Sequence, residues 1–550
     1  MEIFFTILIM ILVVSLSGVA ARIIPLHFPL PLVQIIIGAL LAWPSIGLHV
    51  NFDPELFLVL FIPPLLFADG LKTPTSEFLH HGREIIGLAL VLVLITVVGI
   101  GYLIYWIIPG IPLIPAFALA AVLSPTDAVA LSGIVGKGRI SKKIMSIVQG
   151  EALMNDASGL VSLKFAIAVA MGTMVFTWSG ASFEFLKVSL GGLFAGVVIC
   201  WLYGKSLRFM SRWSDDDPAT QTVLLMLLPF ASYLLAEHVG VSGILAAVAA
   251  GMTITRSGLM RQAPLAMRLR ANSVWHMLDF VFNGMVFLLL GLQLPGIMEQ
   301  TIAGTHGDQS ADLLMLIGDV VLIYFALMLV RFGWLWLMKR LSKRFLKNKP
   351  LEFSHYTLRE LLVATFAGVR GAVTLAGVLS IPIFMNNGDI FPGRYQMVFL
   401  ATGVILLSLV VGVIVLPLLL KKLPGADKTV NKHEIQAARV EMAKIAIDSV
   451  YKMERRLAAD EEENADPELL KEISSRIIGT MRRRIEGKDD FEKALYLENL
   501  ERRFRLTALR AERAEVYHLR ANHKISNESM VSLLLDLDLL EAVLVEKESE

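Results

Sequence analysis

Long apolar runs repeat through most of this sequence, and they constrain its fold more than any other feature. Each run has about 18 residues or more, enough for a helix to cross the hydrocarbon core of a bilayer, and the runs continue to about residue 422. We therefore expect an all-α polytopic membrane protein with about thirteen transmembrane helices. The predicted spans cover residues 3–20, 29–48, 55–71, 84–108, 113–136, 146–175, 185–204, 220–237, 241–255, 273–294, 313–338, 358–381 and 396–420.

The charges in the predicted loops alternate from one side of the membrane to the other. The odd-numbered loops contain 20 lysine and arginine residues, whereas the even-numbered loops contain only Arg394. Positive charge collects in cytoplasmic loops. The pattern therefore predicts an outside N-terminus, a cytoplasmic C-terminus and an odd number of spans.

Composition excludes several classes of protein. With 550 residues and 55% hydrophobic content, and a mean hydropathy of +0.65, the chain is too apolar for a soluble protein of this length. The net charge of +1 gives no large basic surface for nucleic acid. The one cysteine, Cys200, lies in an apolar run, which excludes a disulfide framework and a thiolate metal site.

The composition changes after Pro424. Residues 425–550 are densely charged with both signs, and apolar positions such as Leu533, Leu537 and Leu540 recur at helical spacing. We expect two domains: a transmembrane domain over residues 1–422 and a cytoplasmic helical domain over residues 423–550.

Two carboxylates and an amide interrupt the sixth predicted span. Glu151 and Asn155 are four residues apart and share a helix face, whereas Asp156 lies about 140° from Glu151 around the helix. The two carboxylates therefore point to different neighbours. Since ionisable residues in a membrane are costly and usually mark an ion path, one of them can be structural and the other functional.

Spans five and twelve each contain a signal for an interrupted helix. In span five, Pro125 lacks an N–H group, and the neighbouring Thr126 and Asp127 offer hard oxygen ligands that suit Na+. In span twelve, Arg370 lies between Gly368 and Gly371. The two spans are seven apart, as expected for six spans, a linker span and six inverted spans, and paired interruptions indicate a transporter site.

The polar residues of these spans lie at similar predicted depths. Asp127, Asp156 and Arg370 are ten to thirteen residues from a basic residue of a cytoplasmic loop, or roughly 15–20 Å along a helix. Arg370 cannot lose its proton and needs a carboxylate partner. Pairing with Glu151 leaves Asp156 for a mobile ion, and Asp127 is the alternative partner.

Three further polar residues are candidates for the same cavity. Asp69 follows Pro63 and Pro64 in span three, near the predicted cytoplasmic end, where it can also be an interfacial charge. Asp279 and Asn283 are four residues apart in span ten and share a face.

Five motifs together resemble the Na+/H+ antiporter family of the NhaP and NHE type, over about residues 5–420. The motifs are Phe61–Phe67, Ser124–Val129, Gly150–Asp156, Ser242–Ala246 and Val369–Ala372. The resemblance implies a thirteen-span homodimer built as an inverted repeat, with crossed, interrupted helices five and twelve. It also implies a dimerisation domain and a moving core domain.

By this resemblance, Asp156 binds the cation and the proton alternately, Asn155 holds the site through hydrogen bonds, and Thr126 and Asp127 complete it, with Na+ held by Asp156 and Thr126. Glu151 and Arg370 fall on the structural ion pair of the family. The single aspartate of the motif implies electroneutral one-for-one exchange.

Two positions depart from the family pattern. Ala152 stands where many relatives have serine, and Ala68 separates Asp69 from the Leu-Phe pair. Both departures leave the full ligand set open, and with it the choice between Na+ and K+.

We therefore expect an antiporter that exchanges Na+, or K+ or Li+, for H+ in the inner membrane of a bacterium and serves pH homeostasis. We expect no catalytic site and no cofactor. The alternatives are a K+/H+ antiporter, an uncoupled cation channel that uses the same carboxylates, and a receptor-like membrane protein whose tail signals.

Overall fold

A computed structural model describes residues 2–23, 29–43, 59–73, 75–136, 139–174, 178–210, 217–304, 309–345, 351–386, 388–421, 428–459, 466–486 and 491–545. The chain divides into two compact units, Met1–Ala426 and Asp427–Glu550. This division lies four residues beyond the predicted boundary at residue 422.

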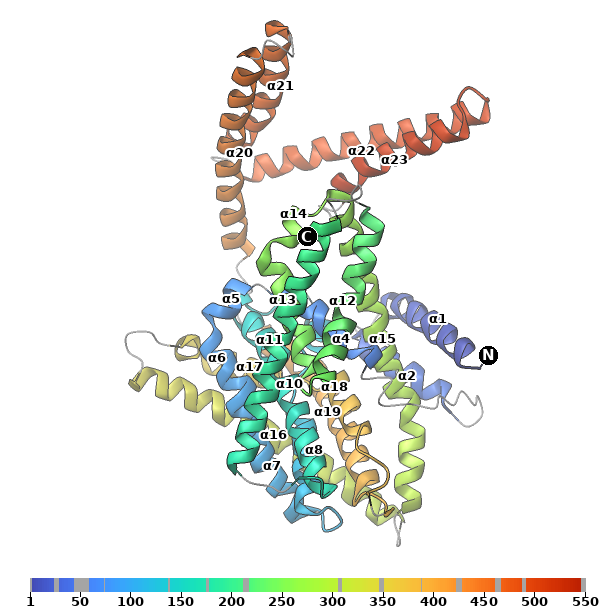
Figure 1. The fold of residues 1–550 in the computed structure, drawn as a ribbon, viewed down its shortest axis with the longest axis vertical. Coiled ribbons are helices and arrows are strands. Elements are labelled where there is room, and N and C mark those ends of the chain that lie inside the picture. Colours follow the sequence, from blue (N-terminus) through green and yellow to red (C-terminus); the bar gives the residue numbers. More distant parts are fainter. Residues whose placement is uncertain are drawn as a thin grey trace. The chain divides into compact units, whose positions relative to one another are not determined.

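The first unit is built from helices (Figure 1). They are α1 (Glu2–Ile23), α2 (Leu30–Leu41), α4 (Ile62–Lys72), α5 (Thr75–His80), α6 (Gly82–Ile86), the π-helix η1 (Gly87–Leu92), α7 (Val93–Ile107), α8 (Leu113–Leu123), α9 (Ala128–Val135), α10 (Lys142–Ala170), α11 (Trp178–Met210), α12 (Pro218–His238), α13 (Gly243–Ser257), α14 (Leu259–Gln262), α15 (Leu265–Gly304), α16 (Gln309–Phe345), the 3₁₀ helix η2 (Glu352–His355), α17 (Leu358–Phe366), α18 (Ala372–Leu379) and α19 (Arg394–Leu420).

Many of these helices have the length and apolar character of membrane spans. Among the described residues, eight helices can cross a membrane by length and composition, and nine if the bent pair α8 and α9 forms one span. The helices α2 and α13 are apolar but shorter. Residues 44–58, which include the end of predicted span two and the start of predicted span three, lie outside the described residues. The all-helical membrane fold is confirmed, while the count of thirteen spans stays a prediction.

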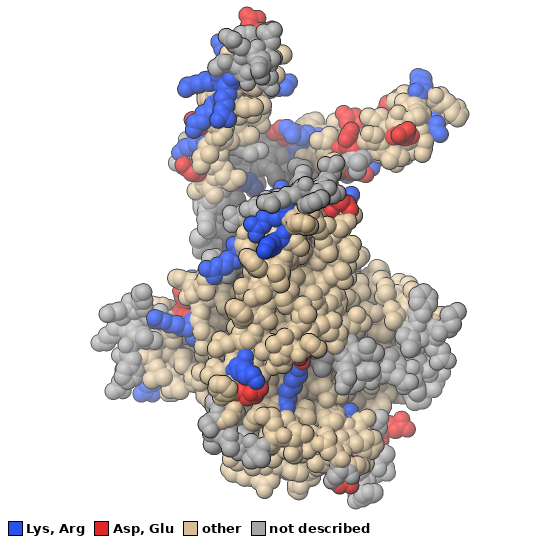
Figure 2. Space-filling view, in the orientation of Figure 1, with Lys and Arg blue, Asp and Glu red and all other residues tan. Residues whose placement is uncertain are grey.

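The surface and the helix contacts both fit a membrane protein. The face of the first unit seen in Figure 2 is largely free of charged side chains. Inside, α2 packs closely on α15 at Gly38 and Gly291, where a Cβ atom on either glycine would overlap the other helix's backbone. Small residues at such crossings let membrane helices approach closely.

Two predicted interruptions occur where the sequence places them. The helices α8 and α9 bend by 46° across the break that contains Pro125, and α17 and α18 are separated by residues 367–371. Proline removes a donor and clashes with the preceding turn, so α8 ends just before Pro125. In span three, the predicted distortion appears as a helix start, because Pro63 and Pro64 occupy the first turn of α4.

The second unit contains α20 (Lys428–Ala459), α21 (Pro467–Glu486), α22 (Phe491–Ala521) and α23 (Asn527–Val545). In it, α20 packs on α21 and α22 packs on α23 (Figure 1). Leu509, Val516 and Leu537 form a small buried cluster between α22 and α23. Of the apolar positions named from helical spacing, Leu537 lies in this cluster, whereas Leu533 and Leu540 are exposed.

Candidate cation-binding site

The break between α8 and α9 is organised by Asp127. Its carboxylate accepts hydrogen bonds from the N–H groups of Val129 at 2.8 Å and Ala130 at 2.9 Å, so it caps the start of α9. A helix begins with N–H groups that lack intrahelical partners, and an aspartate at the cap satisfies them. Asp127 is therefore both a helix cap and a carboxylate at membrane depth.

The break between α17 and α18 is organised by Arg370. Its guanidinium donates to the carbonyl of Leu123, at the end of α8, at 3.2 Å, and to the carbonyl of Gly368. Its main-chain N–H donates to the hydroxyl of Ser408 at 3.0 Å. These bonds satisfy carbonyl groups that the helix breaks leave without intrahelical partners.

A short main-chain contact joins the two breaks. The N–H of Asp127 donates to the carbonyl of Val369 at 2.7 Å. At the same point a Cβ atom added to Gly371 would overlap the carboxylate of Asp127. Glycine is therefore required there because the two interrupted helices approach so closely.

The predicted ion pair between Glu151 and Arg370 is wrong. Glu151 is held by Arg331 on α16, whose guanidinium donates to both carboxylate oxygens, one of them at 2.7 Å. Arg331 also donates to the carbonyl of Ala364 at 3.0 Å. Among the described residues, the hydrogen bonds of the Arg370 guanidinium go to main-chain carbonyls. Helical spacing predicted that Glu151 and Asp156 face different neighbours, but it did not predict which helix faces Glu151.

Asn155 positions the site without lining it. Its amide donates to the hydroxyl of Thr126 at 2.9 Å, and both side chains are fully buried. This bond ties α10 to the break between α8 and α9. Because the Thr126 hydroxyl uses one lone pair to accept this bond, its proton and its second lone pair remain available to other partners.

A small cavity collects most of the predicted ligands. Asp69, Thr126, Asp127, Asp156 and Asn283 all line it. The remaining lining residues are Ile62, Leu65, Leu66, Pro125, Val129, Gly371, Val373 and Thr374. The lining thus carries three carboxylates and no basic side chain, an oxygen-rich environment that suits a hard cation.

Asp279 lies beside the cavity rather than in its lining. It forms an ion pair with Lys72 at 2.5 Å and accepts a hydrogen bond from Asn283 at 2.8 Å. Asp279 therefore orients Asn283, and its charge is balanced by Lys72 at the end of α4. Of the two predicted candidates in span ten, Asn283 is the one that reaches the cavity.

Sequence reasoning missed two features of the site. Thr374, in the first turn of α18, adds a hydroxyl to the cavity, and its position just after the Gly371 break was the available signal. The π-helix η1 was also missed, and Ser158 on α10 donates to the carbonyl of Ala89 within it at 2.6 Å. A π-helical turn leaves main-chain carbonyls available to such a donor.

Comparisons with known proteins agree with one another. A family model described as sodium/hydrogen exchanger, transmembrane, matches residues 7–422. The chain is 70% identical over 547 residues to an uncharacterized Na+/H+ exchanger of Escherichia coli, YjcE, and the match covers all of both chains. It is 37% identical over 534 residues to a sodium, potassium, lithium and rubidium/H+ antiporter of Bacillus pumilus, covering 97% of this chain and 77% of the relative.

The fold is also similar to that of a solved structure. The sodium proton antiporter MjNhaP1 of Methanocaldococcus jannaschii aligns with a TM-score of 0.56 at 17% identity. The alignment covers 77% of this chain and 99% of that chain. At this identity the likeness concerns the fold alone.

Proposed function

The chain belongs to the sodium/hydrogen exchanger family, and from this premise we propose that it exchanges Na+ for H+ across the membrane through competition of the two ions for Asp156. The observation that carries the proposal is the cavity beside the two helix breaks, where Asp156 lies with Asp69, Thr126 and Thr374. The exchanged ions are substrates, and the mechanism requires no cofactor and no catalytic site.

Burial supplies the reason for competition. A bare carboxylate is costly in a low-dielectric site, and either a bound proton or a bound cation removes that cost. Asp156 is buried on α10, and no basic residue lines the cavity with it. A core that moves readily only when Asp156 is loaded would exchange one ion for the other. Asp156, Thr126 and the other lining oxygens would hold Na+, while Asn155 fixes Thr126.

The structure supports a scaffold role for the residues around this cavity. Glu151 and Arg331 tie α10 to α16, and Arg370 holds the end of α8. We therefore assign the structural ion pair to Glu151 and Arg331. Arg370 serves as a fixed positive charge at the crossing, and Asp127 serves as a helix cap.

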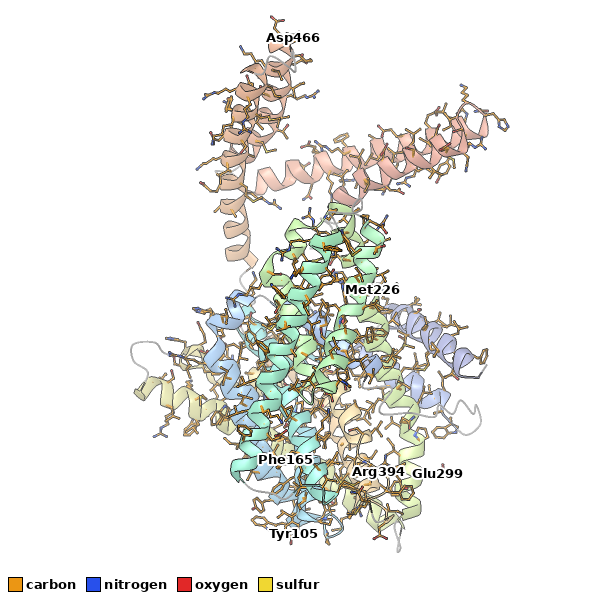
Figure 3. All side chains as sticks on the ribbon, in the orientation of Figure 1. Tyr105, Phe165, Met226, Glu299, Arg394 and Asp466 are labelled. Carbon is orange, nitrogen blue, oxygen red and sulfur yellow. The ribbon has the colours of Figure 1, made fainter. Side chains whose placement is uncertain are left out.

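The proposed topology places the N-terminus outside and the C-terminus in the cytoplasm. In agreement with it, Figure 3 places Tyr105, Glu299 and Arg394 at the same end of the first unit, and all three belong to even-numbered loops or their edges. We propose that the chain is a homodimer in the inner membrane of a bacterium and that its exchange is electroneutral and contributes to pH homeostasis. The charged second unit would lie in the cytoplasm.

Reconstitution into liposomes with an internal pH dye tests the proposal. An inward Na+ gradient is expected to alkalinise the lumen through the unaltered protein, because each Na+ that enters drives an H+ out, but not through Asp156→Asn. Asp319→Asn is the matched control, because Asp319 is a buried carboxylic acid on α16 that does not line the cavity. Na+-dependent proton movement that survives in Asp156→Asn would refute the assignment.

The same liposomes distinguish the remaining transport modes. Equal rates with and without an imposed membrane potential support one-for-one exchange, whereas Na+ current without proton movement indicates an uncoupled channel. The relative from Bacillus pumilus is named for four cations. For that reason K+, Li+ and Rb+ gradients belong in the experiment, and a K+ response larger than the Na+ response would make K+ the substrate.

A further inference from the structure

A second group of ligand-type side chains lies outside the cavity described above. His80, His81 and Glu352 each offer one atom, an imidazole nitrogen or a carboxylate oxygen, and these atoms lie within 4.8 Å of one another. Glu352 is 271 positions after His81 in the chain, so the fold rather than the local sequence brings them together. None of the three lines the proposed cation cavity.

A partly buried hydrogen bond joins the two segments that carry these side chains. His80 is the last residue of α5, His81 directly precedes α6, and Glu352 begins η2, in the connection between α16 and α17. The N–H of Glu352 donates to the buried carboxylate of Glu84 on α6 at 2.9 Å. This hydrogen bond fixes the position of η2 against α6, and it thereby keeps Glu352 near His80 and His81.

The ring nitrogens are available to a ligand. Among the described residues, the two imidazoles contact each other edge to face at 5.0 Å and have no hydrogen-bond partner. His81 is 7% exposed, and His80 is on the surface. Two imidazoles and one carboxylate make a donor set that suits Zn2+ and similar transition metals, whereas Ca2+ and Mg2+ prefer oxygen ligands alone.

The spacing is close to that of a metal site. Ligand atoms about 2.05 Å from a tetrahedral Zn2+ ion lie roughly 3.3 Å from one another. The three ligand atoms lie within 4.8 Å of one another, so binding requires them to approach by up to about 1.5 Å, and the side chains of His80 and Glu352 are not fully buried. Three protein ligands leave a fourth position for water.

The carboxylate of Glu352 forms an ion pair with Lys143. Its ammonium group lies 3.3 and 3.4 Å from the two oxygens of Glu352, and its side chain is 65% exposed. An exposed ion pair of this kind contributes little stability, so a divalent ion can replace the lysine at modest cost. Lys143 lies in the first turn of α10, the helix that carries Asp156.

We propose that His80, His81 and Glu352 bind a divalent transition-metal ion of the Zn2+ type, and that the bound ion displaces Lys143 from Glu352. The ion would join the α5–α6 turn to the connection between α16 and α17. By the predicted topology both segments lie on the cytoplasmic side.

Calorimetric titration of Zn2+ into the full-length protein in detergent tests this site, with a purification tag that contains no histidine. The unaltered protein is expected to bind one ion per chain, and His80→Ala and Glu352→Gln to weaken binding by about tenfold or more. Lys143→Met is expected to bind more tightly, because it removes both a competitor and a like charge. His238→Ala is the matched control, since it removes an exposed histidine from the far end of α12.

The melting temperature is a second measurement, for variants that fold too poorly for calorimetry. Zn2+ is expected to raise the melting temperature of the unaltered protein and of His238→Ala but not that of His80→Ala, because an ion that binds only the folded state stabilises it. The proposal is overturned if the unaltered protein shows no saturable binding. It is also overturned if His80→Ala and Glu352→Gln bind as the unaltered protein does. Both readouts need no ion exchange, so failure of the antiport proposal would leave them unaffected.

Discussion

Replacing Glu151 with glutamine tests which arginine this carboxylate holds. Glu151 and Arg331 have side chains that are 1% and 4% exposed, and two hydrogen bonds join them. Removing one partner of a buried pair leaves an uncompensated charge and costs about 3–5 kcal/mol. Glutamine keeps one oxygen acceptor, and Arg331 keeps its bond to Ala364, so we expect a value near the lower end of that range. For a unit of this size, such a loss lowers the melting temperature by about 3–6 °C.

The assay is thermal unfolding in detergent, followed by size-exclusion chromatography with fluorescence detection. Glu184→Gln is the control, because it breaks an exposed pair with Lys187 that is expected to contribute about 0–1 kcal/mol. The double variant Glu151→Gln with Arg331→Met should recover much of the lost stability, since it removes both charges.

Two outcomes would contradict the reasoning. A Glu151→Gln protein as stable as the Glu184→Gln control would show that the pair contributes little. Recovery by Arg370→Met instead of Arg331→Met would show that Arg370 is the true partner of Glu151.

Three further predictions concern the cavity and the crossing. Thr126→Val removes the hydroxyl that accepts a hydrogen bond from the Asn155 amide and that lines the cavity. The apparent KM for Na+ in the liposome assay should therefore rise about tenfold. An unchanged KM would exclude Thr126 as a ligand. Gly371→Ala forces a Cβ atom into the Asp127 carboxylate and should cost about 1–3 kcal/mol in thermal unfolding, whereas Gly99→Ala, which meets open space, should not destabilise. If H+ and Na+ compete for one carboxylate, the apparent KM for Na+ should rise about tenfold for each unit by which the pH falls in the acidic range, while the maximal rate stays constant. A maximal rate that falls at constant KM would argue against a shared site.

The sequence predicted the parts of the site that depend on local chemistry. Proline and glycine act on their own backbone, so the breaks at Pro125 and Gly371 could be located from the chain alone. Depth counted along the helices brought Asp127, Asp156 and Arg370 to one level, and two of these, Asp127 and Asp156, line the same cavity. These inferences needed only the rise per residue and the position of the loop charges.

The parts that depend on neighbouring helices could not be predicted. Helical spacing showed that Glu151 and Asp156 face different ways, but it could not tell which of two intramembrane arginines faces Glu151. Packing decides this, and it places Arg331 of α16 there. The π-helical turn of η1 has no composition that distinguishes it from the apolar run around it. Its partner, Ser158, becomes meaningful only once α10 lies beside it.

The crossing of the two interrupted helices shapes the electric field at the cavity. Two helices end there and two begin, and each end carries roughly half an elementary charge. Arg370 lies against the carbonyl end of α8, and Asp127 caps the amide end of α9, so each opposes the local dipole. If Asp156 binds the exchanged ion as proposed, its affinity is expected to depend also on charges at this crossing, including Arg370, which is not in the cavity lining. Exchangers with identical cavity linings but different charges at this crossing would prefer different concentrations of the same cation.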